Sequence, residues 1–326
     1  MITRRTLFAS VGAAALAVSP TVVAQDFPSR PIRLVVPFPP GGALDAYVRA
    51  VQEDLGKALG QPVIAENLAG AGGAIGAQAV ARARPDGYTL MAGTIQTLSM
   101  NAAVRSNLGY DPIKDFVPVV QTVMVNYILV VHPGLPVKTL PDLIAYAKAN
   151  PGKVSYATSG TGSPQHMAVA LLQAKTEIDL LHVPYKGIGA VLNDLLAGQV
   201  LMTIADQASL LPHVKAGKLR AIAGASRRRI ADLPELPTIA ETAGLSDYEA
   251  VAWQGLAAPA STPLAVVQRL NEAVNRVQTA PAMSERLRKM GFELVGGSAD
   301  AFRQYIAADL AKWKKVARDN SITVTD

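Results

Sequence analysis

The 326-residue sequence contains no cysteine and only four histidines. Without thiols the chain forms no disulfide and carries no lipid anchor on an N-terminal cysteine. The histidines show no H-E-x-x-H or other metal-ligand spacing, and the G-x-S-x-G motif of a nucleophilic serine is missing as well. These absences disfavour redox, zinc and hydrolase chemistry, so the sequence predicts no catalytic residue, no metal site and no cofactor.

Aromatic residues are also scarce, at 5% of the chain. The net charge of +6 is spread along the sequence, and the only basic run is Arg227–Arg229. Nucleic-acid binding usually requires a basic stripe interleaved with aromatic side chains. We therefore expect no nucleic-acid partner and interpret Arg227–Arg229 as a solvated turn.

No apolar stretch reaches the ~20 residues that a membrane-spanning helix needs. The apolar run Val11–Val18 follows Arg4 and Arg5 and precedes Val22–Ala24, which is the pattern of a cleaved signal peptide. We expect residues 1–24 to be removed, leaving a soluble protein that begins at Gln25 in a bacterial periplasm. The paired arginines fit a twin-arginine signal, and many general-secretion signals begin in the same way.

The mature chain is long enough for two domains. Short apolar runs alternate with longer amphipathic ones, which predicts an α/β protein with parallel sheets and helices on both faces. The expected strands are Ile32–Val36, Val63–Glu66, Thr89–Ala92, Tyr127–His132, Val154–Ala157, Leu180–Pro184, Leu201–Ala205, Arg220–Gly224 and Glu249–Ala257. The expected helices are Leu44–Leu59, Ala74–Ala83, Leu140–Asn150, His166–Thr176, Ile188–Ala197, Ser209–Ala216, Pro263–Gln278, Ala282–Met290 and Ala299–Asn320.

Two glycine-rich turns, PFPPGGALD (37–45) and YATSGTGSPQHM (156–167), each follow an expected strand and open an expected helix. The first N–H groups of a helix lack internal partners and bind anions well. Neither turn carries the lysine of a phosphate-binding loop. The hydroxyls of Ser159, Thr161 and Ser163 in the second turn can hold a ligand oxygen or cap the helix, and both interpretations remain open. Asp45 is interpreted as a helix-start residue rather than a ligand.

A third glycine cluster, GAGGAIG (70–76), departs from the dinucleotide fingerprint G-x-G-x-x-G, because Ile75 stands where the third glycine belongs. We therefore expect no dinucleotide there.

Five motifs occur in an order that resembles the Bug-type periplasmic receptors, the substrate-binding proteins of tripartite tricarboxylate transporters. The resemblance covers nearly all of the mature chain. It implies a two-lobed periplasmic-binding-protein fold of type II, a Venus flytrap with two doubly wound sheets. Lobe one would comprise residues 25–124 with 252–326 and lobe two residues 125–251, with hinge crossings near Val123–Tyr127 and Tyr248–Gly255. The motifs are VVPFPPGGALDAYVR, NLAGAGGAIGAQAVARARPDGYTL, YATSGTGSPQHM, HVPYKGIGAVLNDLLAGQV and WQGLAAPASTP.

The resemblance also implies how the ligand is held: backbone N–H groups, helix starts, hydroxyls and ordered waters bind a small carboxylate without an arginine clamp. His166 opens the helix after the second turn and either faces the cleft or is structural. Asp206 either meets the far end of the ligand or caps the next helix. The implied ligand-binding residues are Phe38, Gly41, Gly42, Ala43, Thr94, Ser159, Thr161, Gly162, Ser163, His166 and Asp206.

Gln96 and Leu98 stand where this family commonly has Ser and His, and Leu44 stands where it often has a small polar residue. A leucine and a longer amide at the mouth of the cleft would favour a mono- or dicarboxylate with an apolar or aromatic body. The expected function is that of a monomeric, non-enzymatic receptor that delivers this ligand to the membrane components of a tripartite tricarboxylate transporter. The alternatives are a secreted α/β enzyme acting on a small carboxylic acid and a ligand sensor that feeds a signalling system.

Overall fold

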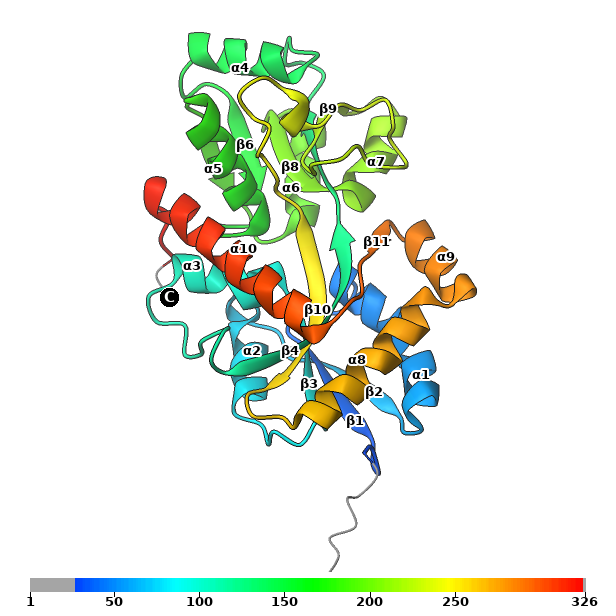
Figure 1. Cartoon of the computed structure of the whole chain (residues 1–326). Coiled ribbons are helices and arrows are strands. Elements are labelled where there is room, and N and C mark those ends of the chain that lie inside the picture. Colours follow the sequence, from blue (N-terminus) through cyan, green and yellow to red (C-terminus); the bar gives the residue numbers. More distant parts are fainter. Residues whose placement is uncertain (1–26, 325–326) are drawn as a thin grey trace, which may run out of the picture.

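The computed structural model describes residues 27–324, so the predicted signal peptide and its cleavage site lie outside the described residues. The strands form two separate sheets, each flanked by helices, in two lobes that the chain connects more than once (Figure 1). This is the predicted two-lobed α/β architecture.

Sheet A has the strand order β11-β4-β10-β3-β1-β2. β1, β2 and β3 run parallel, whereas β10 runs antiparallel to β3 and β4, and β11 antiparallel to β4. The strands are β1 Ile32–Val36, β2 Val63–Asn67, β3 Thr89–Thr94, β4 Phe116–Val125, β10 Ala252–Pro259 and β11 Phe292–Leu294.

Sheet B has the order β7-β6-β8-β5-β9, in which β6 runs parallel to β7 and β8, and β5 antiparallel to β8 and β9. Its strands are β5 Tyr127–Val131, β6 Ser155–Thr158, β7 Leu181–Pro184, β8 Met202–Asp206 and β9 Arg220–Gly224. Both sheets are mixed, so the expectation of parallel sheets is only partly right. Most of the antiparallel strands are those by which the chain leaves or enters a lobe. The division at residues 124/125 and 251/252 stays a prediction.

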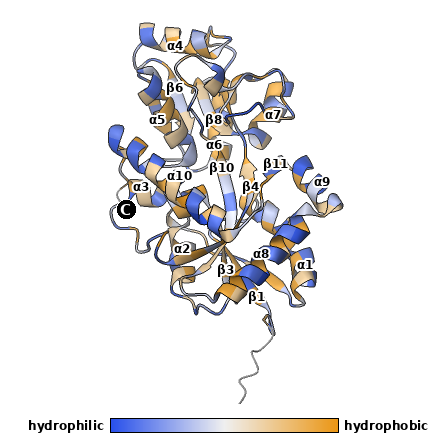
Figure 2. Cartoon of the chain, in the orientation of Figure 1, coloured by the Kyte–Doolittle hydropathy of each residue, from blue (hydrophilic) through white to orange (hydrophobic). Residues whose placement is uncertain are grey.

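Helices cover both sheets (Figure 1). Helix α8 shows why the sequence forms them: Val267, Leu270, Val274 and Val277 are buried at helical spacing, and charged residues occupy the other face. Figure 2 shows the same division, with apolar residues concentrated in the strands and on the inner faces of the helices. The α-helices are α1 Ala43–Leu59, α2 Ala74–Ala81, α3 Asn101–Val104, α4 Leu140–Ala149, α5 Pro164–Thr176, α6 Ile188–Leu196, α7 Gln207–Lys215, α8 Leu264–Thr279, α9 Pro281–Lys289 and α10 Ala299–Asp319.

The long strand β4, which lies between β11 and β10 in sheet A, is not among the strands expected from the sequence. Its sequence FVPVVQTVMV contains Pro118, which cannot donate a ladder hydrogen bond and weakens the signal of an interior strand. The structure accommodates Pro118 where the register between β4 and β10 shifts, at Leu256/Ala257. The π-helical turn η2 (Gln96–Met100), which leads into α3, was missed as well.

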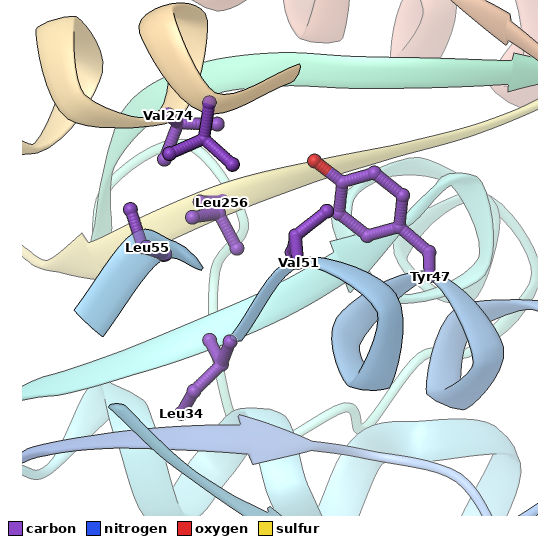
Figure 3. Close-up of a pocket in the computed structure, with 7 residues that line it drawn as sticks. Leu34, Tyr47, Val51, Leu55, Leu256 and Val274 are labelled. Carbon is purple, nitrogen blue, oxygen red and sulfur yellow. The ribbon is translucent and has the colours of Figure 1, made fainter. Parts of the chain in front are cut away.

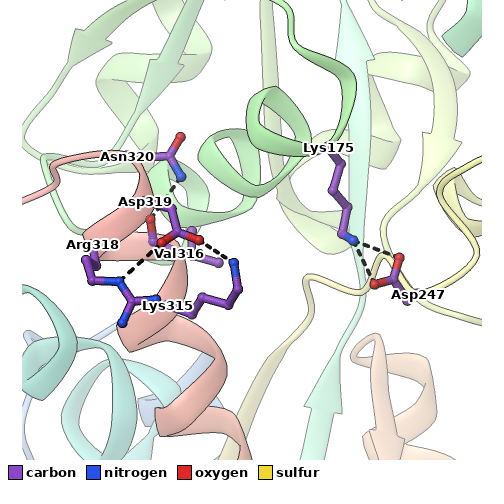
Figure 4. Close-up of polar contacts among 7 residues, drawn as sticks. All are labelled: Lys175, Asp247, Lys315, Val316, Arg318, Asp319 and Asn320. Atoms are coloured by element: carbon purple, nitrogen blue, oxygen red, sulfur yellow. Dashed lines mark hydrogen bonds and ion pairs between the residues drawn. The ribbon is translucent and has the colours of Figure 1, made fainter.

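Helix α10 links the lobes, because it packs against β4 and η2 in lobe one and against α5 in lobe two. Its Asp309 accepts hydrogen bonds from two buried indoles, Trp253 Nε1 at 3.2 Å and Trp313 Nε1 at 2.9 Å. Figure 4 shows the end of α10 and, apart from it, the ion pair between Lys175 of α5 and Asp247 at 2.7 Å, which lies within lobe two. The packing of α10 against both lobes thereby stabilises their relative placement.

Candidate functional site

The carboxyl ends of parallel strands gather at one edge in each sheet. In sheet A, β1, β2 and β3 end at Val36, Asn67 and Thr94. In sheet B, β6 ends at Thr158 and β8 at Asp206. Ligands of open α/β sheets bind at such edges. The two edges meet where Gln96 Nε2 of lobe one donates to Gly162 O of lobe two at 3.4 Å, and we call this meeting place the junction.

The lobe-one turn leaves the start of α1 open. Gly42 is the N-cap residue of α1, and no side chain caps the helix. Gly41, Gly42 and Ala43 are exposed, while Phe38 is half-buried. Gly41 has φ +90°, a conformation that favours glycine. The first N–H groups of α1 are therefore available to an anion.

Asp45 supports this turn from inside the protein. Its carboxylate accepts from Gly41 N at 3.1 Å, from Asn67 Nδ2 at 3.0 Å and from Arg49 Nε at 3.3 Å. Asn67 Nδ2 also donates to Phe38 O at 3.1 Å. Burial opposes ionisation of Asp45, but the hydrogen bonds from Asn67 and Gly41 and the charge of Arg49 outweigh it and lower its pKa. Asp45 thus acts at the helix start, as its position in the sequence indicated.

The lobe-two turn uses its side chains to cap α5. Ser163 is the N-cap residue, and its Oγ accepts from His166 N at 3.3 Å. Ser159 Oγ donates to Gln165 Oε1 at 2.8 Å. Thr161 is exposed, whereas Gly162 and Ser163 are buried. Capping uses an acceptor lone pair of Ser163, and its hydroxyl proton stays available to a ligand.

His166 is buried beneath this turn. Its Nδ1 accepts from Gly162 N at 3.0 Å, and its ring stacks on His182 with centroids 4.0 Å apart. Thr158 Oγ1 lies 2.7 Å from His182 Nε2. Burial, with a smaller effect of His182, lowers the pKa of His166 to about 4, and burial also lowers the pKa of His182. In this arrangement His166 holds the shape of the turn.

The third glycine cluster, for which the sequence predicted no binding role, lies at the junction too. Asn101 Nδ2 donates to Gly72 O at 3.0 Å and Asn101 Oδ1 accepts from Gln96 Nε2 at 2.6 Å. A Cβ on Gly73 would lie 2.6 Å from Thr97 Cγ2 and 3.0 Å from Phe38 Cζ. The position of this turn in the sequence could have identified it. The turn follows β2, which runs parallel to β1, so both strands end at the same edge of sheet A.

The remaining predicted residues have local partners. Asp206 is the N-cap residue of α7 and accepts from Ser209 N at 2.8 Å. Thr94 N donates to Thr97 Oγ1 at 3.0 Å. The expectation that Leu98 lies at the mouth of the cleft is wrong, because its side chain is fully buried and packs over Gly93. Leu44 is buried as well, so the basis on which an apolar or aromatic ligand body was expected is removed.

The junction is closed in this structure. A Cβ on Gly162 would lie 2.9 Å from Val104 Cγ2 and 2.8 Å from Val324 Cγ2. Only a residue without a side chain fits there, so Gly162 lets lobe two pack directly on lobe one. Within residues 27–324 no helix is long and apolar enough to cross a membrane, and no group of three or more His, Cys, Asp or Glu residues could hold a metal ion.

Two lobes with mixed sheets, joined by strands that cross between them, define a periplasmic binding protein. The family model described as "Tripartite tricarboxylate transporter family receptor" matches residues 47–322. The chain belongs to this family, whose members are substrate-binding receptors and not enzymes. This confirms the predicted resemblance and excludes the enzyme alternative.

Similar proteins support this assignment. Protein BugT of Bordetella pertussis is 36% identical over 299 residues, which cover 91% of each chain. The structure of R. palustris Rpa4515 with adipate has a TM-score of 0.81 at 36% identity and covers 91% of this chain and 99% of its own. MatC (Rpa3494) from Rhodopseudomonas palustris with bound malate has a TM-score of 0.77 at 33% identity and covers 89% and 99%.

Proposed function

We propose that this protein closes its two lobes around one small mono- or dicarboxylate and delivers it, as a monomer in the periplasm, to the membrane components of a tripartite tricarboxylate transporter. The observation that carries the proposal is the uncapped start of α1 at the edge that meets the hydroxyl-bearing turn of lobe two. Adipate and malate in the two similar structures support a carboxylate as the ligand.

The donors come from both lobes. Gly42 and Ala43 offer backbone N–H groups, Ser163 and Thr161 offer hydroxyls, and Gly41, Gly162 and His166 shape the two turns. Phe38, Thr94, Ser159 and Asp206 are proposed to complete the site. A partly buried helix start contributes up to ~2 kcal/mol and each charge-assisted hydrogen bond ~1.5–3 kcal/mol. A few such contacts, less the cost of association, reach the roughly −8 kcal/mol of a micromolar receptor.

Closure follows from the packing of Gly162 against Val104 and Val324. We expect the lobes to separate as the ligand enters and to close again around it, so that binding and closure are coupled. The bound form should be more compact by small-angle scattering, and more stable against heat by RT ln(1 + [L]/Kd).

The test is a panel of C3 to C6 mono- and dicarboxylates, screened by thermal shift and measured by calorimetry. Native mass spectrometry of the freshly purified protein serves to identify a retained ligand. We expect one acid per chain, bound without turnover and with a decrease in the radius of gyration. If no member of the panel binds, or if a bound acid leaves the scattering unchanged, the proposal is wrong.

A further inference from the structure

Gln254 is a buried residue whose side-chain oxygen has no partner. It lies in β10, is 4% exposed, and its Oε1 makes no hydrogen bond. A buried acceptor without a donor costs about as much as a lost hydrogen bond, so such atoms are rare. Gln278 in α8 provides the contrast, because it is 1% exposed but its Oε1 accepts from Tyr47 Oη at 3.2 Å.

The register of sheet A places Gln254 at the junction edge. Gln254 lies directly opposite Thr94, the last residue of β3, and Leu256 lies opposite Ala92. Residues opposite each other in an antiparallel pair point to the same face of the sheet. Gln254 therefore lies beside a strand end that already belongs to the candidate site.

The face on which Gln254 lies is the face covered by α1. Successive strand residues alternate between faces. A Cβ on Gly255 would lie 2.3 Å from Phe302 Cζ of α10, so Gly255 faces α10. Figure 3 shows Leu256 directed, with Tyr47 and Val51 of α1, into a small cavity on the other face. Gln254 shares this second face with Leu256, and it lies nearer to the edge where α1 starts.

The spacing suits one small ligand. β10, β3 and β1 are neighbours in sheet A, so Gln254 lies two strand spacings, roughly 10 Å, from the strand that feeds the open start of α1. A ligand whose carboxylate binds the N–H groups of Gly42 and Ala43 would extend its next polar groups over β3 toward Gln254.

We propose that Gln254 is a ligand-binding residue, whose Oε1 accepts a hydrogen bond from a hydroxyl or ammonium group of the bound carboxylate; this rests on the proposed function. A carboxylate oxygen is an acceptor and cannot satisfy Oε1, whereas a hydroxyl or ammonium group can. The residue therefore selects hydroxy- or amino-carboxylates over the same acids without that donor, because those acids leave the acceptor unpaired.

The experiment compares matched acids that differ in one donor: malate and aspartate against succinate, and 2-hydroxyadipate against adipate. Calorimetry on the wild-type protein should show the donor-bearing acid of at least one pair binding about 10-fold or more tightly. In Gln254→Leu the preference should fall to within about 3-fold, chiefly through weaker binding of the donor-bearing acid.

Gln278→Leu is the matched control. It removes a buried glutamine of the same lobe and the acceptor of the Tyr47 hydroxyl, so its melting temperature should fall while the preference stays. Gln254→Leu, by contrast, removes an unsatisfied acceptor and should melt close to the wild type.

If both acids of every pair bind the wild-type protein equally, the inference is overturned and the proposed function stands. An unchanged preference in Gln254→Leu would have the same consequence. If none of these acids binds, the inference fails, and the proposed function is decided separately by the full C3 to C6 panel.

Discussion

Two glycine-rich turns meet at the junction, and they treat the free N–H groups of their helices differently. The lobe-one turn ends in Gly42, which has no side chain to cap α1, and its support comes from Asp45 and Asn67 on its inner side. The lobe-two turn ends in Ser163, which caps α5, and the N–H of Gly162 is taken by His166. Lobe one therefore presents backbone donors, and lobe two presents hydroxyls on a turn whose backbone is already bonded.

The difference teaches that one glycine-rich strand–helix turn is not equivalent to another. In lobe one, binding and folding are separable, because the donors of the turn take no part in holding the fold together. In lobe two, Ser163 would serve both ligand binding and folding, so its substitution should change both affinity and stability.

The largest expected effect is that of Gly42→Val. Gly42 has φ −80° and ψ 171°, and a Cβ there would meet nothing within 4 Å, so the branched side chain fits the protein without strain. It would occupy the space that the carboxylate needs. We expect affinity to fall about 100-fold or more, roughly 3 kcal/mol, for the loss of one or two charge-assisted hydrogen bonds.

Melting of ligand-free Gly42→Val should match the wild type, since the turn is exposed. Calorimetry that finds wild-type affinity would show that the anion site is not at α1.

Ser163→Ala should have the next largest effect on affinity, a loss of ~1.5–3 kcal/mol for the hydroxyl donor. It should also lower the free energy of unfolding by ~0.5–2 kcal/mol, because the cap of α5 is lost. Calorimetric titration and thermal melts measure the two effects separately.

Ser298→Ala is the matched control, because Ser298 caps α10 by accepting from Ala301 N at 3.1 Å, outside the two glycine turns. It should lose similar stability and keep its affinity. If Ser163→Ala behaves in the same way, Ser163 is only a cap.

A stability change with pH tests the support of the lobe-two turn. The pKa of His166 is lowered from 6.5 to about 4, so the folded state disfavours the protonated ring. The contribution of His166 to the free energy of unfolding is fully present above pH 6.5. It is lost as the pH falls toward 4, because the unfolded chain takes up the proton first. We expect a loss of roughly 2 kcal/mol over that range.

In His166→Asn, which keeps a side-chain acceptor but does not titrate, urea unfolding should show a weaker dependence on pH between 6.5 and 4. The same dependence in both proteins would mean that other groups cause it.

Asn67→Ala should have the smallest effect. It removes the donor to Phe38 O and Asp45 Oδ1 without changing the charge, so the lobe-one turn loses part of its support. Affinity should weaken by ~0.5–1.5 kcal/mol, because the turn that presents the backbone donors is held less firmly.

Asn150→Ala, which removes a comparable bond to Tyr146 O in lobe two, is the control for Asn67→Ala and should leave affinity unchanged. A loss of affinity in both variants would point to a general effect on folding rather than to the turn.

Much of the fold could be predicted from local pattern. β1 and β9 have the predicted bounds, and the predicted helices occur with ends shifted by a few residues at most. Strand β4 could not be predicted in this way, because its pairing with β10 depends on residues far apart in the sequence and Pro118 hides the signal. The mixed direction of the strands likewise follows from the two crossings between lobes and not from alternation.

The two turns of the candidate site could be predicted from the sequence. How they lie relative to each other and to neighbouring residues could not. Phe38–Ala43 and Ser159–Ser163 could be proposed as candidate turns because glycine and hydroxyl residues precede helices, and their role in binding stays a prediction. Leu98 was misplaced, because the sequence does not show that η2 turns this side chain into the core. Gln254 was overlooked, since its significance depends on the register with Thr94 and on an acceptor left unpaired by its neighbours.

The most direct test of the central claim, that one carboxylate joins the two turns, is a crystal structure of the protein with an acid that saturates it in calorimetry. We predict that one carboxylate of the ligand accepts a hydrogen bond from the N–H of Gly42 or Ala43 and lies within hydrogen-bond distance of Ser163 Oγ. A carboxylate that contacts only one lobe, or that binds away from both turns, would contradict the account.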